Sequence, residues 1–142
     1  MVAINKLGGI IMLFSLFLPI VLVLVEDRSI FLWLFGLHLY IINGQRETYA
    51  FPDVIGFIMF FVFLVFSIIC ITKDPGTSKT LGILSMVFII IFYIEWLVIC
   101  TLHLYTFNVF PALGEPYPTF IVIPFIGFFG VIIGSILNIA AK

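Results

Sequence analysis

The stretch VIGFIMFFVFLVFSIICIT at residues 54–72 decides the fold class, because it is long, apolar and free of charged side chains. A helix needs about 20 apolar residues to cross the hydrocarbon core of a bilayer. The polar segment KDPGTSK at residues 73–79 follows it, and a second apolar run covers residues 81–105. Because Pro-Gly pairs mark turns, we expect the two runs to form an antiparallel hairpin of membrane-spanning helices.

The composition of the whole chain is typical of a membrane protein. Of its 142 residues, 64% are hydrophobic and 9% are charged, whereas soluble domains are about half apolar and about a quarter charged. The formal net charge of -1 excludes the basic surface that nucleic-acid binding requires. We therefore expect the lipid bilayer to be the main solvent of this chain, and we expect no nucleic acid among its partners.

Apolar runs at residues 7–25 and 120–141 add two further predicted spans. The first imitates a signal peptide, but the charged residues 26–28 follow it directly and no small-residue cleavage site is present. We therefore interpret residues 7–25 as a retained helix. The resulting fold class is an all-α membrane protein, an antiparallel four-transmembrane-helix bundle that forms one domain over residues 1–142.

The segments at residues 20–53 and 106–119 are expected to be extracellular, and the first is expected to form a small β-hairpin or meander. Asn43-Gly44 is a strong hairpin signal. An interfacial or re-entrant helix at residues 30–42 is the alternative, since periodicity cannot separate a helix from a strand in an all-apolar run. The alternating residues 102–109 are a further candidate strand. The predicted strands of the meander are 20–25, 30–42 and 45–51.

The distribution of charge predicts which side of the membrane each segment occupies. All four lysines fall on one side of the predicted topology, and both arginines and five acidic residues fall on the other. Cytoplasmic loops are enriched in Lys and Arg, so the lysine side, with both termini, is predicted to be cytoplasmic. The two sets are Lys6, Lys73, Lys79 and Lys142 against Glu26, Asp27, Arg28, Arg46, Glu47, Asp53 and Glu115.

Glu95 is the one ionisable residue that the predicted topology places deep inside a span. An intramembrane carboxylate is costly and is a candidate functional site, here for a proton or a cation. One alternative is a protonated side chain that donates to a backbone carbonyl freed by Pro19 or Pro124. Another is a position near the outer interface, beside Trp96. We favour a structural role, since a lone carboxylate rarely makes a transport path.

The last apolar run carries small residues at spacings of three and four, which place them along one helix face. Small residues let helix backbones approach closely, and an asparagine can hydrogen-bond across the contact. Gly8, Gly9 and Gly82 are candidate partners within the chain, and a dimerisation face is the alternative. The candidate helix-packing face consists of Gly127, Gly130, Gly134 and Asn138.

No catalytic, phosphate-binding or cofactor motif is found in the sequence. Cys70 and Cys100 fall near opposite membrane faces in the predicted topology, so we expect two unpaired core residues. His38 and His103 lack the spacing of metal ligands and are expected to be solvated or hydrogen-bonded. We therefore predict no catalytic residue, no metal site and no cofactor.

These observations favour a non-enzymatic function. We expect a polytopic membrane protein that serves as an accessory or structural subunit of a larger membrane complex, or that self-associates as a homo-oligomer. The alternative is a small channel or transporter subunit in which Glu95 binds a proton or a cation. Short loops leave little room for a soluble catalytic domain.

The predicted layout resembles that of claudin-like proteins, which combine strands in a first extracellular segment, a short cytoplasmic hairpin and a smaller second outer loop. Trp33 and Gly36-Leu37 match part of the claudin signature of a Trp, then Gly-Leu-Trp, with two cysteines. His38 stands where the second Trp is expected, and the segment has no cysteine. The resemblance is one of layout, and it implies no functional residue in this chain.

Overall fold

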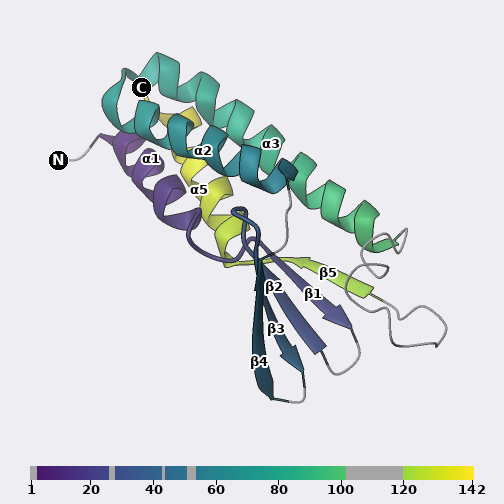
Figure 1. Cartoon of the computed structure of the whole chain (residues 1–142). Coiled ribbons are helices and arrows are strands. Elements are labelled where there is room, and N and C mark those ends of the chain that lie inside the picture. The colour runs from purple at the N-terminus through teal and green to yellow at the C-terminus, as the bar shows by residue number, and fades with distance from the viewer. Residues whose placement is uncertain (1–2, 26–27, 43, 51–53, 102–119) are drawn as a thin grey trace.

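A computed structural model describes residues 3–25, 28–42, 44–50, 54–101 and 120–142 of the chain. The helices lie together at one end of the molecule, and a β-sheet extends from the other end (Figure 1). Along the chain the elements are α1 (Ile4–Ser15), β1 (Val21–Val25), β2 (Arg28–Leu32), β3 (Leu37–Ile42), β4 (Gln45–Ala50), α2 (Val54–Thr72), α3 (Pro75–Thr101), β5 (Phe120–Pro124) and α5 (Ile126–Ala140).

The helices pack side by side. α1 contacts α2 and α5, and α3 contacts the same two helices, so together they close into a ring. The start of α1 and the end of α5 lie beside the connection between α2 and α3, away from the sheet (Figure 1). They share one end of the molecule with the polar residues 73–79, and we call it the turn end.

The sheet has five antiparallel strands in the order β4-β3-β2-β1-β5. The first four strands pair with their neighbours in the chain, and β5 adds to the free side of β1. Because β5 leads directly into α5, and α1 precedes β1, the β1–β5 pair connects two packed helices to the sheet. The sheet is thus larger than the predicted hairpin or meander.

The prediction of a four-transmembrane-helix bundle is wrong, because only two helices among the described residues are long and apolar enough to cross a membrane. These are α2, with 19 residues, and the part of α3 from Pro75 to Val98, with 24 residues. α1 has 12 residues and α5 has 15, which correspond to about 18 Å and about 23 Å of helix. Both are shorter than the ~30 Å hydrocarbon core.

Proline and β-branched residues explain why the predicted spans at 7–25 and 120–141 are too long. Pro19 has no N–H to donate within a helix, and the valine-rich segment after it forms β1. In the last span, Pro124 ends the strand β5, and α5 begins only at Ile126. Each predicted span therefore consists of a short helix and a strand.

The predicted span at residues 81–105 begins earlier than expected, at Pro75. Proline is favoured in the first turn of a helix, where its missing N–H costs nothing. The Pro-Gly pair that predicted a turn therefore lies inside the start of α3. Residues 102–105 lie outside the described ranges.

The predicted strand at residues 30–42 is in fact two strands, and the alternative helix does not form. β2 ends at Leu32 and β3 begins at Leu37, and in the turn between them Gly36 has a φ of 81°. Glycine adopts a positive φ at little cost, which allows the chain to reverse there. The candidate strand at residues 102–109 lies outside the described residues.

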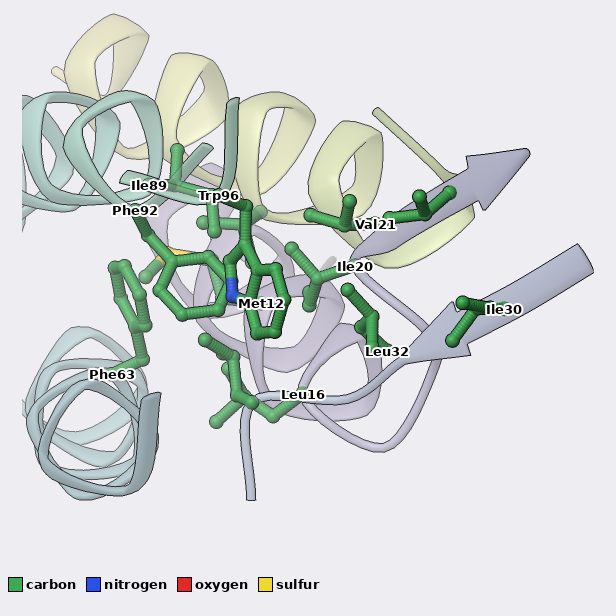
Figure 2. Close-up of a cluster of buried hydrophobic side chains, with 13 residues drawn as sticks. Met12, Leu16, Ile20, Val21, Ile30, Leu32, Phe63, Ile89, Phe92 and Trp96 are labelled. Carbon is green, nitrogen blue, oxygen red and sulfur yellow. The ribbon is translucent and has the colours of Figure 1, made fainter. Parts of the chain in front are cut away.

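The main apolar cluster lies where the helices meet the sheet. Figure 2 shows side chains from α1, α2 and α3 pointing toward those of β1 and β2, with the Trp96 ring among them. Burial of large aromatic and aliphatic side chains contributes most of the stabilisation in such a cluster. Its fully or nearly fully buried members are Met12, Leu16, Ile20, Val21, Val23, Ile30, Leu32, Leu34, Phe63, Ile89, Phe92, Trp96 and Val131.

Candidate functional site

The helices bury polar side chains and expose apolar ones. Phe14 is 69% exposed and Val54 is 67% exposed, whereas none of the buried polar residues is more than 4% exposed. Soluble proteins show the opposite pattern for their polar residues. The polar interior is therefore the candidate functional site. It comprises Asn5, Ser15, Ser67, Ser78, Ser85, Ser135 and Asn138.

Asn5 anchors the start of α1 to the connection between α2 and α3. Its side-chain amide donates to the carbonyls of Cys70 at 3.3 Å and Lys73 at 3.1 Å, and to the Ser78 hydroxyl at 3.3 Å. These carbonyls lie at the end of α2, where a helix has no backbone donors left for them. Because Asn5 is 2% exposed, its amide replaces the water that would bind an exposed helix end.

The predicted helix-packing face of α5 lies against α1. A Cβ atom on Gly134 would come within 2.5 Å of the Met12 Cγ and 2.7 Å of the Gly8 carbonyl oxygen. A Cβ atom on Gly130 would collide with the Ser15 hydroxyl. The backbones of α1 and α5 therefore approach as closely as small residues allow.

Two further glycines extend the close packing along α5. The Gly127 N–H donates to the Pro19 carbonyl at 2.9 Å, so the first turn of α5 is bound to the segment that follows α1. On α3, a Cβ atom on Gly82 would come within 2.8 Å of the Ser135 carbonyl oxygen. α5 is thus held closely on two sides, by α1 and by α3.

Asn138 completes this face at the turn end of α5. Its side-chain nitrogen donates to the Met12 sulfur at 3.2 Å. Its Oδ1 atom has no hydrogen-bond partner among the described residues, and neither does the Ser85 hydroxyl. A Cβ atom on Gly8 would lie 2.5 Å from this Oδ1 atom, so the asparagine side chain packs directly against the glycine.

These contacts close the interior between the helices. At Gly134 and at Gly82 there is no room for one methyl group between neighbouring helices. A bound water needs a cavity of roughly 10–15 Å³ together with polar partners. A continuous aqueous path therefore cannot run along α5 between either of these helix pairs within one chain.

Glu95 lies near the sheet end of α3. The stacked rings of Phe66 and Phe88, with 6.2 Å between their centroids, set α2 and α3 side by side. Glu95 comes seven residues after Phe88, which in the antiparallel pair brings it level with Met59, in the second turn of α2. Glu95 is partly buried and takes part in an interaction within the protein. Its role as a proton or cation site, or as a structural residue, stays a prediction.

The prolines named as sources of free carbonyls do not lie inside helices. α1 ends at Ser15, before Pro19, and α5 begins at Ile126, after Pro124. The Ser15 carbonyl accepts the Leu18 N–H at 3.1 Å. The premise that a proline inside a helix frees a carbonyl for Glu95 therefore does not hold.

Asp74 caps the start of α3 at the turn end. Its carboxylate accepts the Thr77 N–H at 3.0 Å and the Thr77 hydroxyl at 2.9 Å. These two hydrogen bonds, the backbone one first, hold the pKa of Asp74 below its ordinary value. The carboxylate satisfies one of the orphan N–H groups of the helix.

The remaining sequence-predicted residues are not brought together. Cys70 is buried at the end of α2, and Cys100 lies in the last turn of α3. His38 lies on β3, and His103 is outside the described residues. In the described part of the chain, no group of three His, Cys, Asp or Glu residues is arranged to hold a metal ion.

Sequence reasoning missed two polar contacts that join elements far apart in the chain. One is the Asn5 amide. The other is the Tyr93 hydroxyl, which donates to the Val122 carbonyl on β5 at 2.9 Å. A polar residue within an apolar run, as at both positions, was the signal that could have revealed them.

Comparison with known proteins gives no relative: no family model, no curated protein and no solved structure matches this chain. The resemblance to claudin-like proteins therefore remains one of layout.

Proposed function

We propose that this chain is an integral membrane protein in which α2 and α3 cross the bilayer as a hairpin. The reversed burial of polar and apolar side chains is the observation that carries the proposal. Only 22% of the α2 span and 28% of the α3 span are buried in the protein. A core helix of a soluble protein would bury most of its residues, so lipid is the medium that suits these two surfaces.

The short helices α1 and α5 lie in lipid beside this hairpin. Their outward faces are as apolar as those of α2 and α3, with Leu7 45% exposed and Phe129 52% exposed. Their inward faces carry the glycines and asparagines that hold the helices together. This division of small and polar residues inside, and large apolar residues outside, is typical of helix packing in membranes.

The turn end of the helices faces the cytoplasm in this proposal, with both termini. Lys6 follows Asn5, whose amide binds the Lys73 carbonyl, and Lys79 follows Ser78 at the same connection. Arg28 and Arg46 belong to the strands at the other end. Lysines gathered at one end of the helices are the pattern expected of a cytoplasmic side.

The role that we propose is non-enzymatic: an accessory or structural subunit of a larger membrane complex, or of a homo-oligomer. The polar groups of the interior are used to pack the helices against one another, and the surface left for partners is apolar along the helices. The sheet is then presented on one side of the membrane. Small residues and hydrogen bonds that serve to pack helices together suit a structural subunit.

Native mass spectrometry after gentle extraction from the chain's own membrane tests this role. Stoichiometric association with other membrane proteins, or with copies of itself, is the expected result. A chain that stays monomeric under conditions that preserve known complexes of the same membrane contradicts the proposal. Extraction of the chain by alkaline carbonate, which releases proteins not inserted in the bilayer, contradicts membrane insertion itself.

The transport alternative requires Glu95, and it can be tested separately. We expect Glu95→Gln to leave the associated partners unchanged in the same mass spectrometry experiment. In liposomes that carry the purified chain, we expect no proton or cation flux that depends on Glu95. If the unsubstituted chain carries a flux and Glu95→Gln abolishes it, the structural role is wrong and the transport role takes its place.

A further inference from the structure

We infer that the part of the β-sheet nearest the helices lies within the hydrocarbon layer, where its open face contacts lipid acyl chains. The inference rests on the proposed membrane insertion and extends it to residues outside the helices. The residues concerned are the segment that joins α1 to β1, the turn between β2 and β3, and the end of β5 next to α5. We call these three segments together the sheet base.

Contact with α3 gives the first measure of depth. Val122 of β5 accepts a 2.9 Å hydrogen bond from the hydroxyl of Tyr93. Tyr93 is inside α3, eight residues before the helix ends at Thr101, which is about 12 Å along the helix. The end of β5 is therefore level with residues of a membrane-spanning helix.

Contact with α2 gives a second, independent measure. The ring of Phe35, in the turn between β2 and β3, packs edge to face against the ring of Phe60, with 5.7 Å between centroids. Phe60 is six residues inside the α2 span that begins at Val54, which is about 9 Å. Both spanning helices thus meet the sheet base at a similar depth.

The backbone N–H and C=O groups between α1 and β1 form hydrogen bonds within the protein, as surroundings of lipid require. Non-helical backbone is tolerated at membrane depth only where its polar groups are satisfied within the protein. Between α1 and β1, the N–H groups of Leu16, Phe17, Leu18 and Ile20 all donate to backbone carbonyls, and Pro19 has no N–H. Carbonyls in the same segment are paired too. Phe17 accepts from the Trp33 indole at 3.1 Å, and Ile20 accepts from the Phe125 N–H at 2.8 Å.

Two features reduce the exposed polar groups at the free edge of β5 at the same depth. In the register of β5 with β1, the Phe125 N–H bonds to the Ile20 carbonyl. By the alternation of an antiparallel ladder, Val122 and Pro124 then turn their backbone groups away from β1. Pro124 has no N–H to expose, and the Val122 carbonyl is the one that Tyr93 binds. An edge strand in water needs neither device, since water satisfies its groups.

The open face of the sheet has a polarity gradient that matches this placement. Val21 and Ile30 point to the buried face, so their neighbours point to the open one. The open-face row nearest the helices is apolar on β5, β1, β2 and β3, and only Thr48 on β4 is polar. Ile123 in this row is 37% exposed. The next row outward contains Ser29 and the exposed Arg46. The rows are Ile123, Leu22, Phe31, Leu39 and Thr48, then Ile121, Leu24, Ser29, Ile41 and Arg46.

Lipid is the occupant that we assign to this face because the apolar surface continues onto α5 without a break. Ile123 on β5 is followed by Ile126 and Phe129 on α5, which are 55% and 52% exposed. These α5 side chains belong to the surface that faces lipid in the proposed function. A surface that passes from helix to strand without a polar boundary suits one continuous medium.

Nitroxide accessibility tests the inference on the full chain, reconstituted in dioleoylphosphatidylcholine vesicles. Single cysteines are introduced and spin-labelled at Ile123 on the sheet base, at Val65 on the exposed face of α2, and at Arg46 in the outer row of β4. The unsubstituted chain, treated in the same way, gives the background from its own cysteines. Collision rates with molecular oxygen, which enters lipid, and with a water-soluble nickel chelate are then compared.

We expect the labels at Ile123 and Val65 to collide more with oxygen than with nickel, and the label at Arg46 to show the reverse. If Val65 is in lipid and Ile123 is reached by nickel, the sheet base is in water and the inference is wrong. If Val65 is in lipid and Ile123 is shielded from both reagents, a protein covers the face and the inference is also wrong. A Val65 label that nickel reaches refutes the proposed membrane insertion itself. Leu22→Cys, in the same row, replaces Ile123→Cys should the latter fail to fold.

Discussion

The hydroxyl of Tyr93 and the carbonyl of Val122 form a 2.9 Å hydrogen bond between α3 and β5. The bond joins a helix that is long and apolar enough to span a membrane to the edge of the sheet. It also pairs a backbone carbonyl that no neighbouring strand can reach, because β5 is the last strand on its side. Removal of this bond therefore reports on the environment of the sheet edge.

Tyr93→Phe is expected to destabilise the folded chain by about 1–2 kcal/mol, because a carbonyl left unpaired away from water loses a hydrogen bond without compensation. Unfolding in a graded mixture of mild and denaturing detergent measures the change. Thr72→Val is the control, since the Thr72 hydroxyl donates only to carbonyls of its own helix, at Ile68 and Ile69. Equal effects of the two substitutions would contradict the assigned role of Tyr93.

Gly134→Ala is expected to destabilise the protein by about 1–3 kcal/mol, the usual cost of overpacking. The added methyl meets the Gly8 carbonyl oxygen at 2.7 Å, and a backbone atom cannot move away without shifting α1. Gly76→Ala is the matched control, because the only atom near its Cβ belongs to the exposed side chain of Asp74, at 3.1 Å. The same detergent titration applies. A Gly134 variant as stable as the Gly76 variant would show that α1 and α5 are not in close contact.

Substitutions of Asn5 test whether its side chain donates hydrogen bonds, because an aspartate has the same shape but no amide donor. Asn5→Ala removes the amide donor of the Lys73 carbonyl and leaves the Cys70 carbonyl with the Ser78 hydroxyl at 3.4 Å, at an expected cost of about 1–3 kcal/mol. Asn5→Asp keeps the shape but places a carboxylate against the carbonyl end of α2, where negative charge is unfavourable. Asn5→Asp should therefore be the less stable variant at neutral pH. Stabilities in the opposite order would mean that Asn5 does not donate to these carbonyls.

The cap formed by Asp74 predicts a dependence on acid. The pKa of Asp74 is lower in the folded chain than its ordinary value, so its ionised form stabilises the fold. This contribution is complete above the ordinary pKa of an aspartate, about 3.9, and is lost as the pH falls through the lower folded value. Detergent unfolding between neutral pH and pH ~3 is expected to show the loss.

Asp74→Asn serves as the control for that experiment. An asparagine at this position still accepts the Thr77 N–H, but it does not ionise. The variant should therefore lack the part of the acid dependence that comes from Asp74. Identical acid profiles for the two chains would contradict the assignment.

The two long apolar helices α2 and α3 could be predicted from the sequence because their signals are local. The α2 helix covers Val54–Thr72, the same bounds that the uncharged run indicates. An unbroken apolar run of this length has one low-energy arrangement in a bilayer, since every backbone group is satisfied within the helix. No other element need be known to place it.

The ends of α1 and α5 could not be predicted in this way. The run at residues 7–25 is apolar throughout, and hydropathy alone assigns all of it to one span. The predicted strand at residues 20–25 overlaps this span, and β1 at Val21–Val25 agrees with the strand. The sequence did not reveal the second neighbour of β1, because β5 is almost a hundred residues later in the chain.

The candidate helix-packing face and two of its candidate partners follow from small residues and their spacing. Four small or polar residues on one face of a helix indicate a close contact. The spacing does not decide between a partner within the chain and another chain. The structure places Gly8 of α1 and Gly82 of α3 against this face, whereas Gly9 meets α2 instead. The depth of Glu95 in a bilayer stays a prediction.

The position of β5 in the sheet means that the sheet can be completed only after most of the chain has been synthesised. Strand β1 is made early, yet its second neighbour is residues 120–124, which leave the ribosome only after both spanning helices. Until then one edge of β1 is open beside the membrane, with backbone donors and acceptors that lipid cannot satisfy. In the proposed membrane topology, the nascent chain therefore carries an unfinished sheet until residues 120–124 have been made.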